Sequence, residues 1–212
     1  MSMIGQVRQI TPDELQELRR NPRQVKKLLH GKAPADAGKA FAALQRVQEL
    51  GMQARAAGAT NDPAERERIR SQILRELESA GVRAPGDGPD EEGLSLEKSW
   101  HSLHYLLTGS AGEVASPLGN AVLGGPPIGG ELGYGPARVL EPEQVRAVAS
   151  ALAGLSKDDL ARRFDLGAMS AANVYACDDE SELELAQHYF EHLVRYYADA
   201  AARGNAVLLY ID

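Results

Sequence analysis

The side chains best suited to chemistry lie on one short segment, residues 95–108, with the sequence SLEKSWHSLHYLLT. Its periodicity predicts a helix, and Gly109 behind it favours a left-handed cap. Four apolar side chains share the face that we expect in the core: Leu96, Trp100, Leu103 and Leu107. Four polar side chains share another face, named here the histidine stripe: His101, His104, Tyr105 and Thr108. Imidazole acts as an acid or a base near neutral pH, so this stripe is the first candidate site.

A glycine-rich stretch follows the stripe and could fold back over it. Residues 109–135 contain nine glycines and three prolines, which predicts a long loop without regular structure. The loop could bring Tyr134 or Arg138 to the stripe. In such a pocket, the candidate residues are Trp100, His101, His104, Tyr105, Tyr134 and Arg138. His104 would transfer protons, His101 and Tyr105 would orient a ligand, and Arg138 would hold an anion.

A structural interpretation of the same residues competes with the catalytic one. Buried His and Tyr side chains often only satisfy loop carbonyl groups, and a long glycine-rich loop needs such anchors. No carboxylate accompanies the histidines at a recognisable spacing, and two histidines without a third ligand are weak support for a metal. The sequence therefore favours the structural interpretation and predicts neither a metal nor a cofactor at the stripe.

The segment from His188 to His192 matches the H-x-x-E-H pattern of one class of zinc peptidases. A helical wheel places six side chains on the core face: Leu183, Ala186, Phe190, Leu193, Val194 and Tyr197. The two histidines lie roughly 160° from that face, so we expect them in solvent. No glutamate follows His192 as a third ligand. The pattern therefore does not predict a peptidase.

Two further motifs are incomplete. The segment Thr108–Gly112 has threonine where the G-x-S-x-G serine elbow requires glycine, and a helix rather than a strand precedes it. The glycine-rich stretch lacks the lysine and hydroxyl of a phosphate-binding loop, and Gly133-Tyr134-Gly135 does not continue as a dinucleotide motif. The sequence therefore identifies no serine hydrolase and no nucleotide site.

Composition indicates a globular protein and excludes several classes. The chain has 212 residues, 43% hydrophobic and 25% charged, and no apolar run near the roughly 20 residues of a membrane span. The net charge of −7 is uneven, because residues 1–80 carry 14 Lys and Arg against 10 Asp and Glu. Basic residues alternate with acidic ones and aromatics are only 5%, so we expect no nucleic-acid partner. A single cysteine, Cys177, and the lack of a signal sequence are typical of a cytoplasmic protein.

The elements that must position these residues alternate between many helices and few strands. Strands are expected at 3–10, 137–140 and 206–212, and the last should pair with the first or its neighbour. Helices are expected from Pro12, from Asn21 to about Leu29, and over 142–152, 156–164 and 178–203. Two more amphipathic helices, near 36–57 and 63–80, would make residues 31–93 an inserted or extended helical hairpin. The pattern predicts one α+β domain, mostly helical, with a small mixed or antiparallel sheet from the terminal and central short strands.

Four segments carry a resemblance to a known family: MIGQVRQITPDEL at the start, WHSLHYLLTG at 100–109, GYGPARVL at 133–140 and the closing AVLLYID. Through them the chain resembles the YfbM-like family, a bacterial domain-of-unknown-function family, over about residues 1–30 and 94–212. The resemblance implies a compact α+β fold and a cytoplasmic location. It implies no activity, so no catalytic residue is carried over.

Two functions remain open from the sequence. The first is a non-catalytic binding or protein-interaction module, with a protein partner or a second copy of the chain held by the 31–93 hairpin. The second is a small-molecule binding protein or enzyme that uses His101, His104 and Tyr105 beneath the Gly109–Gly135 loop. We expect the first, because no catalytic constellation in the sequence is complete.

Overall fold

The structure, a computed structural model, describes residues 2–30, 46, 68 and 93–212. The chain divides into two compact units, one formed by Met1–Lys27 with Pro89–Asp212 and the other by Leu28–Gly88. The expected 31–93 hairpin, apart from Arg46, Arg68 and Gly93, lies outside the described residues.

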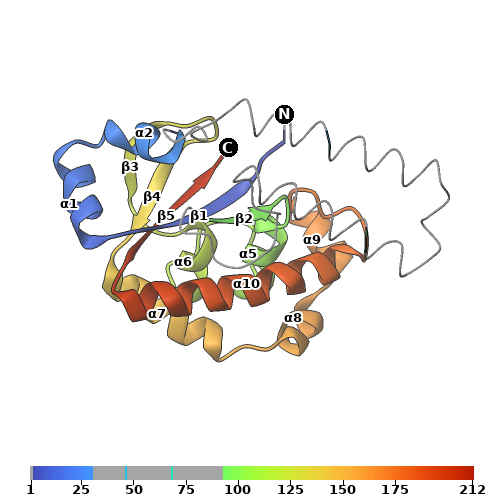
Figure 1. Ribbon diagram of the computed structural model, residues 1–212. Helices are drawn as coiled ribbons and strands as arrows, with labels where there is room; N and C mark the ends of the chain where they lie inside the picture. Colours follow the sequence, from blue (N-terminus) through green and yellow to red (C-terminus); the bar gives the residue numbers. More distant parts are fainter. Residues whose placement is uncertain (1, 31–45, 47–67, 69–92) are drawn as a thin grey trace. The chain divides into compact units, whose positions relative to one another are not determined.

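A five-stranded antiparallel sheet runs through this unit in the order β2-β1-β5-β4-β3 (Figure 1). The strands are β1 (Gly5–Ile10), β2 (Leu94–Glu97), β3 (Pro127–Glu131), β4 (Pro136–Leu140) and β5 (Ala206–Ile211). The two ends of the chain pair along the whole of β1 and β5, and the backbones of Ile4 and Asp212 extend the pairing by two hydrogen bonds of 2.9 and 3.1 Å. The predicted α+β class is confirmed, with an antiparallel sheet.

Eight helices accompany the sheet in the described residues. They are α1 (Pro12–Arg20), α2 (Gln24–His30), α5 (Trp100–Thr108), α6 (Pro117–Leu123), α7 (Pro142–Ala153), α8 (Lys157–Arg163), α9 (Leu166–Ala171) and α10 (Glu182–Arg203). Local sequence accounts for several ends. Thr11 and Glu14 form the capping box of α1, and Gly109 and Gly204 end α5 and α10 in the left-handed conformation at φ 76° and 68°.

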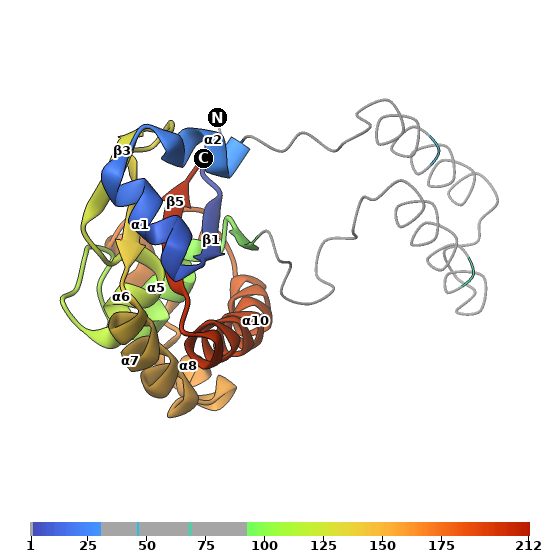
Figure 2. The same ribbon diagram turned by 60° about the vertical axis from the view of Figure 1, so that its left-hand side comes forward.

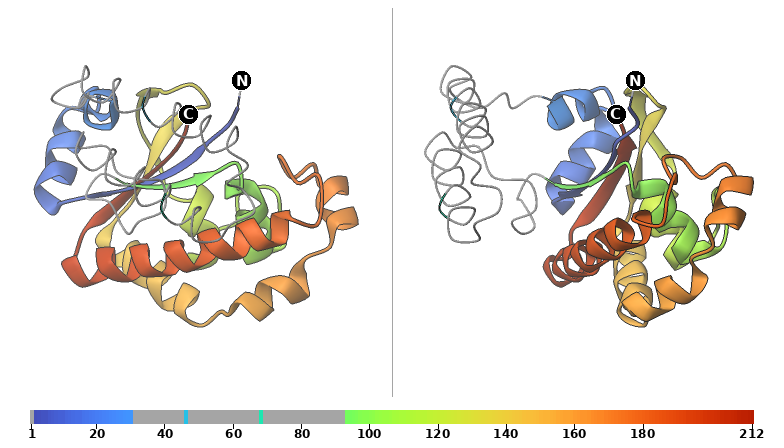
Figure 3. Two further views of the ribbon diagram at one scale, coloured as in Figure 1. Left: turned by 45° about the vertical axis from the view of Figure 1, so that its right-hand side comes forward. Right: turned by 90° about the vertical axis from the view of Figure 1, so that its right-hand side faces the viewer.

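The two faces of the sheet carry separate apolar layers, because successive strand residues point to opposite sides. Val7, Val207 and Leu209 face the main core, which is built mainly from α5, α6, α7 and α10. Residues of the other parity, such as Ile10 and Leu208, are buried on the opposite face. Figure 3 shows α1 on one side of the strands and α5 and α6 on the other, and Figure 2 shows α1 in front of β1 and β5. The sheet is thus covered by helices on both sides.

Three expectations about the elements were wrong. Residues 95–97 belong to β2, so the helix of the histidine stripe begins at Trp100. The stretch 109–135, expected as one loop, contains α6 and β3. Helix α9 was not expected at all. Gly119 in this stretch permits close packing, since a Cβ there would lie 2.0 Å from the carbonyl oxygen of Val114.

Candidate functional site

His101 joins two loops through both of its ring nitrogens. Its Nδ1 accepts a hydrogen bond of 2.9 Å from the backbone N–H of Tyr175, and its Nε2 lies 2.9 Å from the carbonyl oxygen of Ala111. A carbonyl only accepts, so Nε2 carries the proton and the ring is the neutral Nε2–H tautomer. The ring also stacks on Trp100, with centroids 4.6 Å apart and planes 6° apart. A proton on Nδ1 would point at the backbone N–H of Tyr175, so two donors would face each other and the hydrogen bond would be lost.

His104 holds the same loop one residue further along and is fully buried. Its Nε2 donates to the carbonyl oxygen of Gly112 at 2.8 Å, whereas Nδ1 is buried and has no hydrogen-bond partner among the described residues. Burial lowers the pKa of His104; the Gly112 carbonyl opposes that shift, His101 adds to it and Glu113 opposes it. The neutral ring therefore works as a donor inside the fold, and no face of it is open to solvent.

The other two residues of the stripe, Thr108 and Tyr105, also have structural contacts. The hydroxyl of Thr108 donates to the carbonyl oxygen of His104 at 2.8 Å and accepts from the N–H of Ser110 at 3.1 Å. Tyr105 is half-buried and packs against the main core. The structure thus brings His101, His104 and Thr108 together around the start of the loop, with Trp100 beside them.

Tyr134 and Arg138, the two residues that the glycine-rich stretch was expected to bring to the stripe, lie in different places. Arg138, on β4, forms an ion pair with Glu113 and donates to the carbonyl oxygen of Gly125 at 3.0 Å. It therefore reaches the loop that the histidines hold, next to Gly112. Tyr134 lies in the turn between β3 and β4 and is 41% exposed. Arg138 is thereby joined to the anchored loop, and its guanidinium already has a carboxylate partner.

A second group of polar side chains is buried where α5 meets the start of α10. This group, named here the Glu182 cluster, comprises Ser99, Ser102, Cys177 and Glu182. Burial raises the pKa of Glu182, and the hydroxyls of Ser99 and Ser102 oppose that shift. Burial also raises the pKa of Cys177, and the Ser102 hydroxyl opposes it. The thiol therefore stays protonated near neutral pH and is a poor nucleophile.

Local irregularities gather around the Glu182 cluster. Glu182 Oε1, Ser102 Oγ and the Trp100 indole N–H are buried without a hydrogen bond of ordinary geometry among the described residues. Glu97 and Ala176 adopt left-handed backbone angles, φ 49° and 54°, next to these residues in the chain. Unpaired buried groups and strained backbone are costly, which makes this region a second place to look for function.

Sequence reasoning missed this cluster, although one signal was available. Glu182 lies four residues before Ala186 and eight before Phe190, so it continues the buried stripe of α10. An acidic residue on a stripe that is otherwise apolar indicates a buried carboxylate. Cys177 and Ser102 gave no comparable signal, because both residue types are common in ordinary cores and loops.

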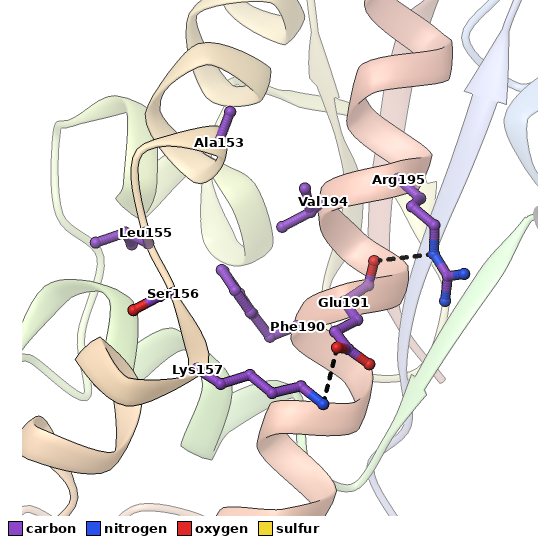
Figure 4. Close-up of a pocket in the computed structure, with 8 residues that line it drawn as sticks. All are labelled: Ala153, Leu155, Ser156, Lys157, Phe190, Glu191, Val194 and Arg195. Atoms are coloured by element: carbon purple, nitrogen blue, oxygen red, sulfur yellow. Dashed lines mark hydrogen bonds and ion pairs between the residues drawn. The ribbon is translucent and has the colours of Figure 1, made fainter.

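A cleft of about 450 Å³ opens between the α7–α8 connection and α10 (Figure 4). We name it the α7–α10 cleft, and its lining residues are Ala153, Leu155, Ser156, Lys157, Phe190, Glu191, Val194 and Arg195. Figure 4 shows Phe190 between the two walls and an ion pair from Lys157 to Glu191, 2.8 Å long, at one end. The volume lies in the range of small-ligand pockets.

The polar groups of the cleft are already engaged. The Ser156 hydroxyl accepts from the N–H of Asp159 and donates to its carboxylate at 2.6 Å, as the cap of α8. A hydrogen bond from Lys157 lowers the pKa of Glu191, which keeps it ionised and a weak base. Arg195 Nε donates to the carbonyl oxygen of Glu191 at 3.3 Å. The arrangement offers an apolar surface with a charged border and no nucleophile beside a base.

The metal-like pattern on α10 lies at the surface. His188 is exposed and His192 is half-buried. Within residues 2–30, 46, 68 and 93–212, no group of three or more His, Cys, Asp or Glu side chains is placed to hold a metal ion. A three-ligand zinc site of the peptidase kind is therefore not formed by the described side chains.

The fold and this geometry define a class: an α+β protein with a five-stranded antiparallel sheet, whose most conspicuous histidines hold its own loops. Residues 1–210 match the family described as "Domain of unknown function (DUF1877)". The chain belongs to that family. No curated protein matches its sequence.

A solved structure shares the fold. It is a protein of unknown function, YfbM, from Escherichia coli, with a TM-score of 0.57 and 17% sequence identity. The match covers 99% of this chain and 99% of that one. The resemblance to the YfbM-like family is thus confirmed, and at this identity the likeness concerns the fold. No helix among the described residues has the length and apolar character needed to cross a bilayer.

Proposed function

We propose that this protein is a non-catalytic binding module that recognises another protein. One observation carries the proposal: His101 and His104, the residues best suited to acid–base chemistry, form neutral hydrogen bonds to the backbone at Ala111, Gly112 and Tyr175. Proton transfer to a ligand would require the loop to leave His104. The imidazole nitrogens that could have transferred protons instead hold backbone groups of the fold.

The α7–α10 cleft supports the same function. Its apolar walls, Leu155 and Val194 among them, and its ionic border are typical of a small contact surface. The cleft is open rather than enclosed, and its hydroxyl, carboxylate and lysine are committed to neighbours. A partner side chain could enter without disturbing these bonds. The 31–93 hairpin, the partner surface proposed from the sequence, would provide a separate contact for a protein partner or for a second copy of the chain.

One observation favours the second function, a small-molecule binding protein or enzyme. Arg138 and Glu113 lie next to the loop that His101 and His104 hold, so opening this loop would expose imidazole and guanidinium groups together. A cytoplasmic location, no nucleic-acid partner and no cofactor remain part of the proposal. The buried, free Cys177 is compatible with a reducing compartment.

The deciding experiment combines capture and ligand screening on the full-length protein. Val194→Glu places a charge in the cleft, and Leu185→Glu, on an exposed part of the same helix, is the matched control. We expect wild type and Leu185→Glu to retain a protein partner from an extract of the source cell, and Val194→Glu or deletion of residues 36–80 to lose it. Static light scattering of each variant reports self-association. A metabolite that raises the melting temperature of wild type, but not of a folded His104→Gln variant, would refute the proposal in favour of the enzyme.

A further inference from the structure

The surface of α10 carries two histidines, His188 and His192, that make ring contacts in the described part of the chain, among them the edge contact of His188 with Tyr189. His188 and His192 lie one helical turn apart, and their ring centroids are 4.6 Å apart with planes at 61°. In the part of the chain that the structure describes, none of their four ring nitrogens has a hydrogen-bond partner. His101 and His104 differ sharply, because three of their four nitrogens hold backbone groups. The lone pairs on α10 are therefore free for a ligand.

The separation of the two rings fits a shared metal ion. An ion about 2.1 Å from a histidine nitrogen lies roughly 3.2 Å from the ring centre, so two rings at about 90–110° around it have centres about 4.5–5.2 Å apart. The observed 4.6 Å falls in this interval. His188 and His192 are also four residues apart on one helix, the spacing at which two histidines on one helix face bind a zinc ion in H-E-x-x-H sites. Imidazole prefers Zn²⁺, Cu²⁺ and Ni²⁺ to Mg²⁺ or Ca²⁺.

From this geometry we infer that His188 and His192 form a two-histidine chelate for a borderline divalent transition-metal ion on the surface of α10. Water fills the remaining coordination positions, since no third His, Cys, Asp or Glu in the described residues completes the site. Glu191 precedes His192 in the chain, but its carboxylate is paired with Lys157, so it is not counted as a ligand of the ion. The inference is independent of the proposed binding function, because neither histidine lines the α7–α10 cleft.

The test is a calorimetric titration of untagged, full-length protein with Zn²⁺ and with Ni²⁺. We expect one ion per chain in wild type and at least a tenfold weaker dissociation constant in both His188→Ala and His192→Ala. His30→Ala, which removes a histidine elsewhere in the chain, is the control and should bind as wild type does. His188 is exposed, so its replacement by alanine leaves the fold intact. If His192→Ala lowers the melting temperature, the affinity of His188→Ala alone is the test. No binding by wild type, or equal affinity in wild type and His188→Ala, would overturn the inference.

Discussion

Replacement of His104 by leucine tests whether this residue is an anchor for the loop. Leucine is similar in size and fills the site, but it cannot donate to the carbonyl oxygen of Gly112, which His104 Nε2 now reaches at 2.8 Å. Gly112 is itself exposed and its carbonyl oxygen also accepts from Ser110 Oγ at 3.4 Å, so the variant loses one hydrogen bond without leaving a buried carbonyl unpaired. Such a loss costs about 0.5–1.5 kcal/mol. In a protein of this size each kcal/mol shifts the melting temperature by about 2–4 °C. We therefore expect a fall of roughly 1–6 °C, combining these two ranges.

The assay is thermal unfolding followed by far-ultraviolet circular dichroism, with His104→Gln as the matched control. Glutamine keeps an N–H donor near Gly112, so we expect it to lose less than half of what leucine loses. A leucine variant as stable as wild type would refute the anchor role. It would show that the Nε2 hydrogen bond contributes no more than the buried, unpaired Nδ1 costs.

The pH dependence of stability gives an independent check on His104. Burial holds its pKa in the folded state below the usual value of 6.5. The unfolded chain therefore takes up a proton first as the pH falls, so this contribution is complete above about 6.5 and is lost as the pH falls toward and through the folded-state pKa. We expect the free energy of unfolding of wild type to drop over that interval more steeply than that of His104→Gln. Equal slopes would mean that His104 is accessible to protons in the folded state.

Three further predictions concern residues that sequence alone did not single out. Glu182→Gln should stabilise the protein at pH 8 by about 1 kcal/mol in denaturant unfolding, because it removes a poorly paired buried charge. The pKa of Glu182 is raised in the folded state, so its contribution to stability is complete below the usual 4.5 and is lost as the pH rises. The difference in unfolding free energy between the variant and wild type should therefore vanish near pH 4. Gly5→Ala should lower the melting temperature by several degrees, as its Cβ would lie 2.3 Å from that of Trp100 and such overpacking costs about 1–3 kcal/mol; an unchanged value would contradict this packing. Arg163→Met should cost about 1 kcal/mol, since Arg163 donates to the carbonyl oxygens of Leu106 and Leu107 at 3.0 and 3.2 Å at the end of α5, and Arg162→Met is the neighbouring control.

The sequence determined the features that depend on neighbouring residues. The capping box at Thr11, the left-handed ends of α5 and α10 at Gly109 and Gly204, and the closing strand are encoded by residues within a few positions of one another. The sequence also predicted that the closing strand pairs with the first strand or its neighbour, and in the structure β5 pairs with β1 on one side and with β4 on the other. Local chemistry was sufficient for these elements.

Tertiary contacts decided the chemistry of the candidate site. The types and spacing of His101 and His104 predicted both a catalytic stripe and a set of loop anchors, and the positions of Ala111, Gly112 and Tyr175 made them anchors. The Tyr175 contact joins residues 74 apart in the chain, which no local pattern encodes. The burial of Glu182 and Cys177 against Ser102 likewise depends on how α10 meets α5.

The division has a simple physical origin. Helix caps and strand periodicity arise from backbone hydrogen bonds between near neighbours, so the sequence determines them directly. Whether an imidazole is a base or a donor depends on which groups surround its two nitrogens and how much water reaches them. Those surroundings come from segments far apart in the chain, and only the tertiary structure brings them together.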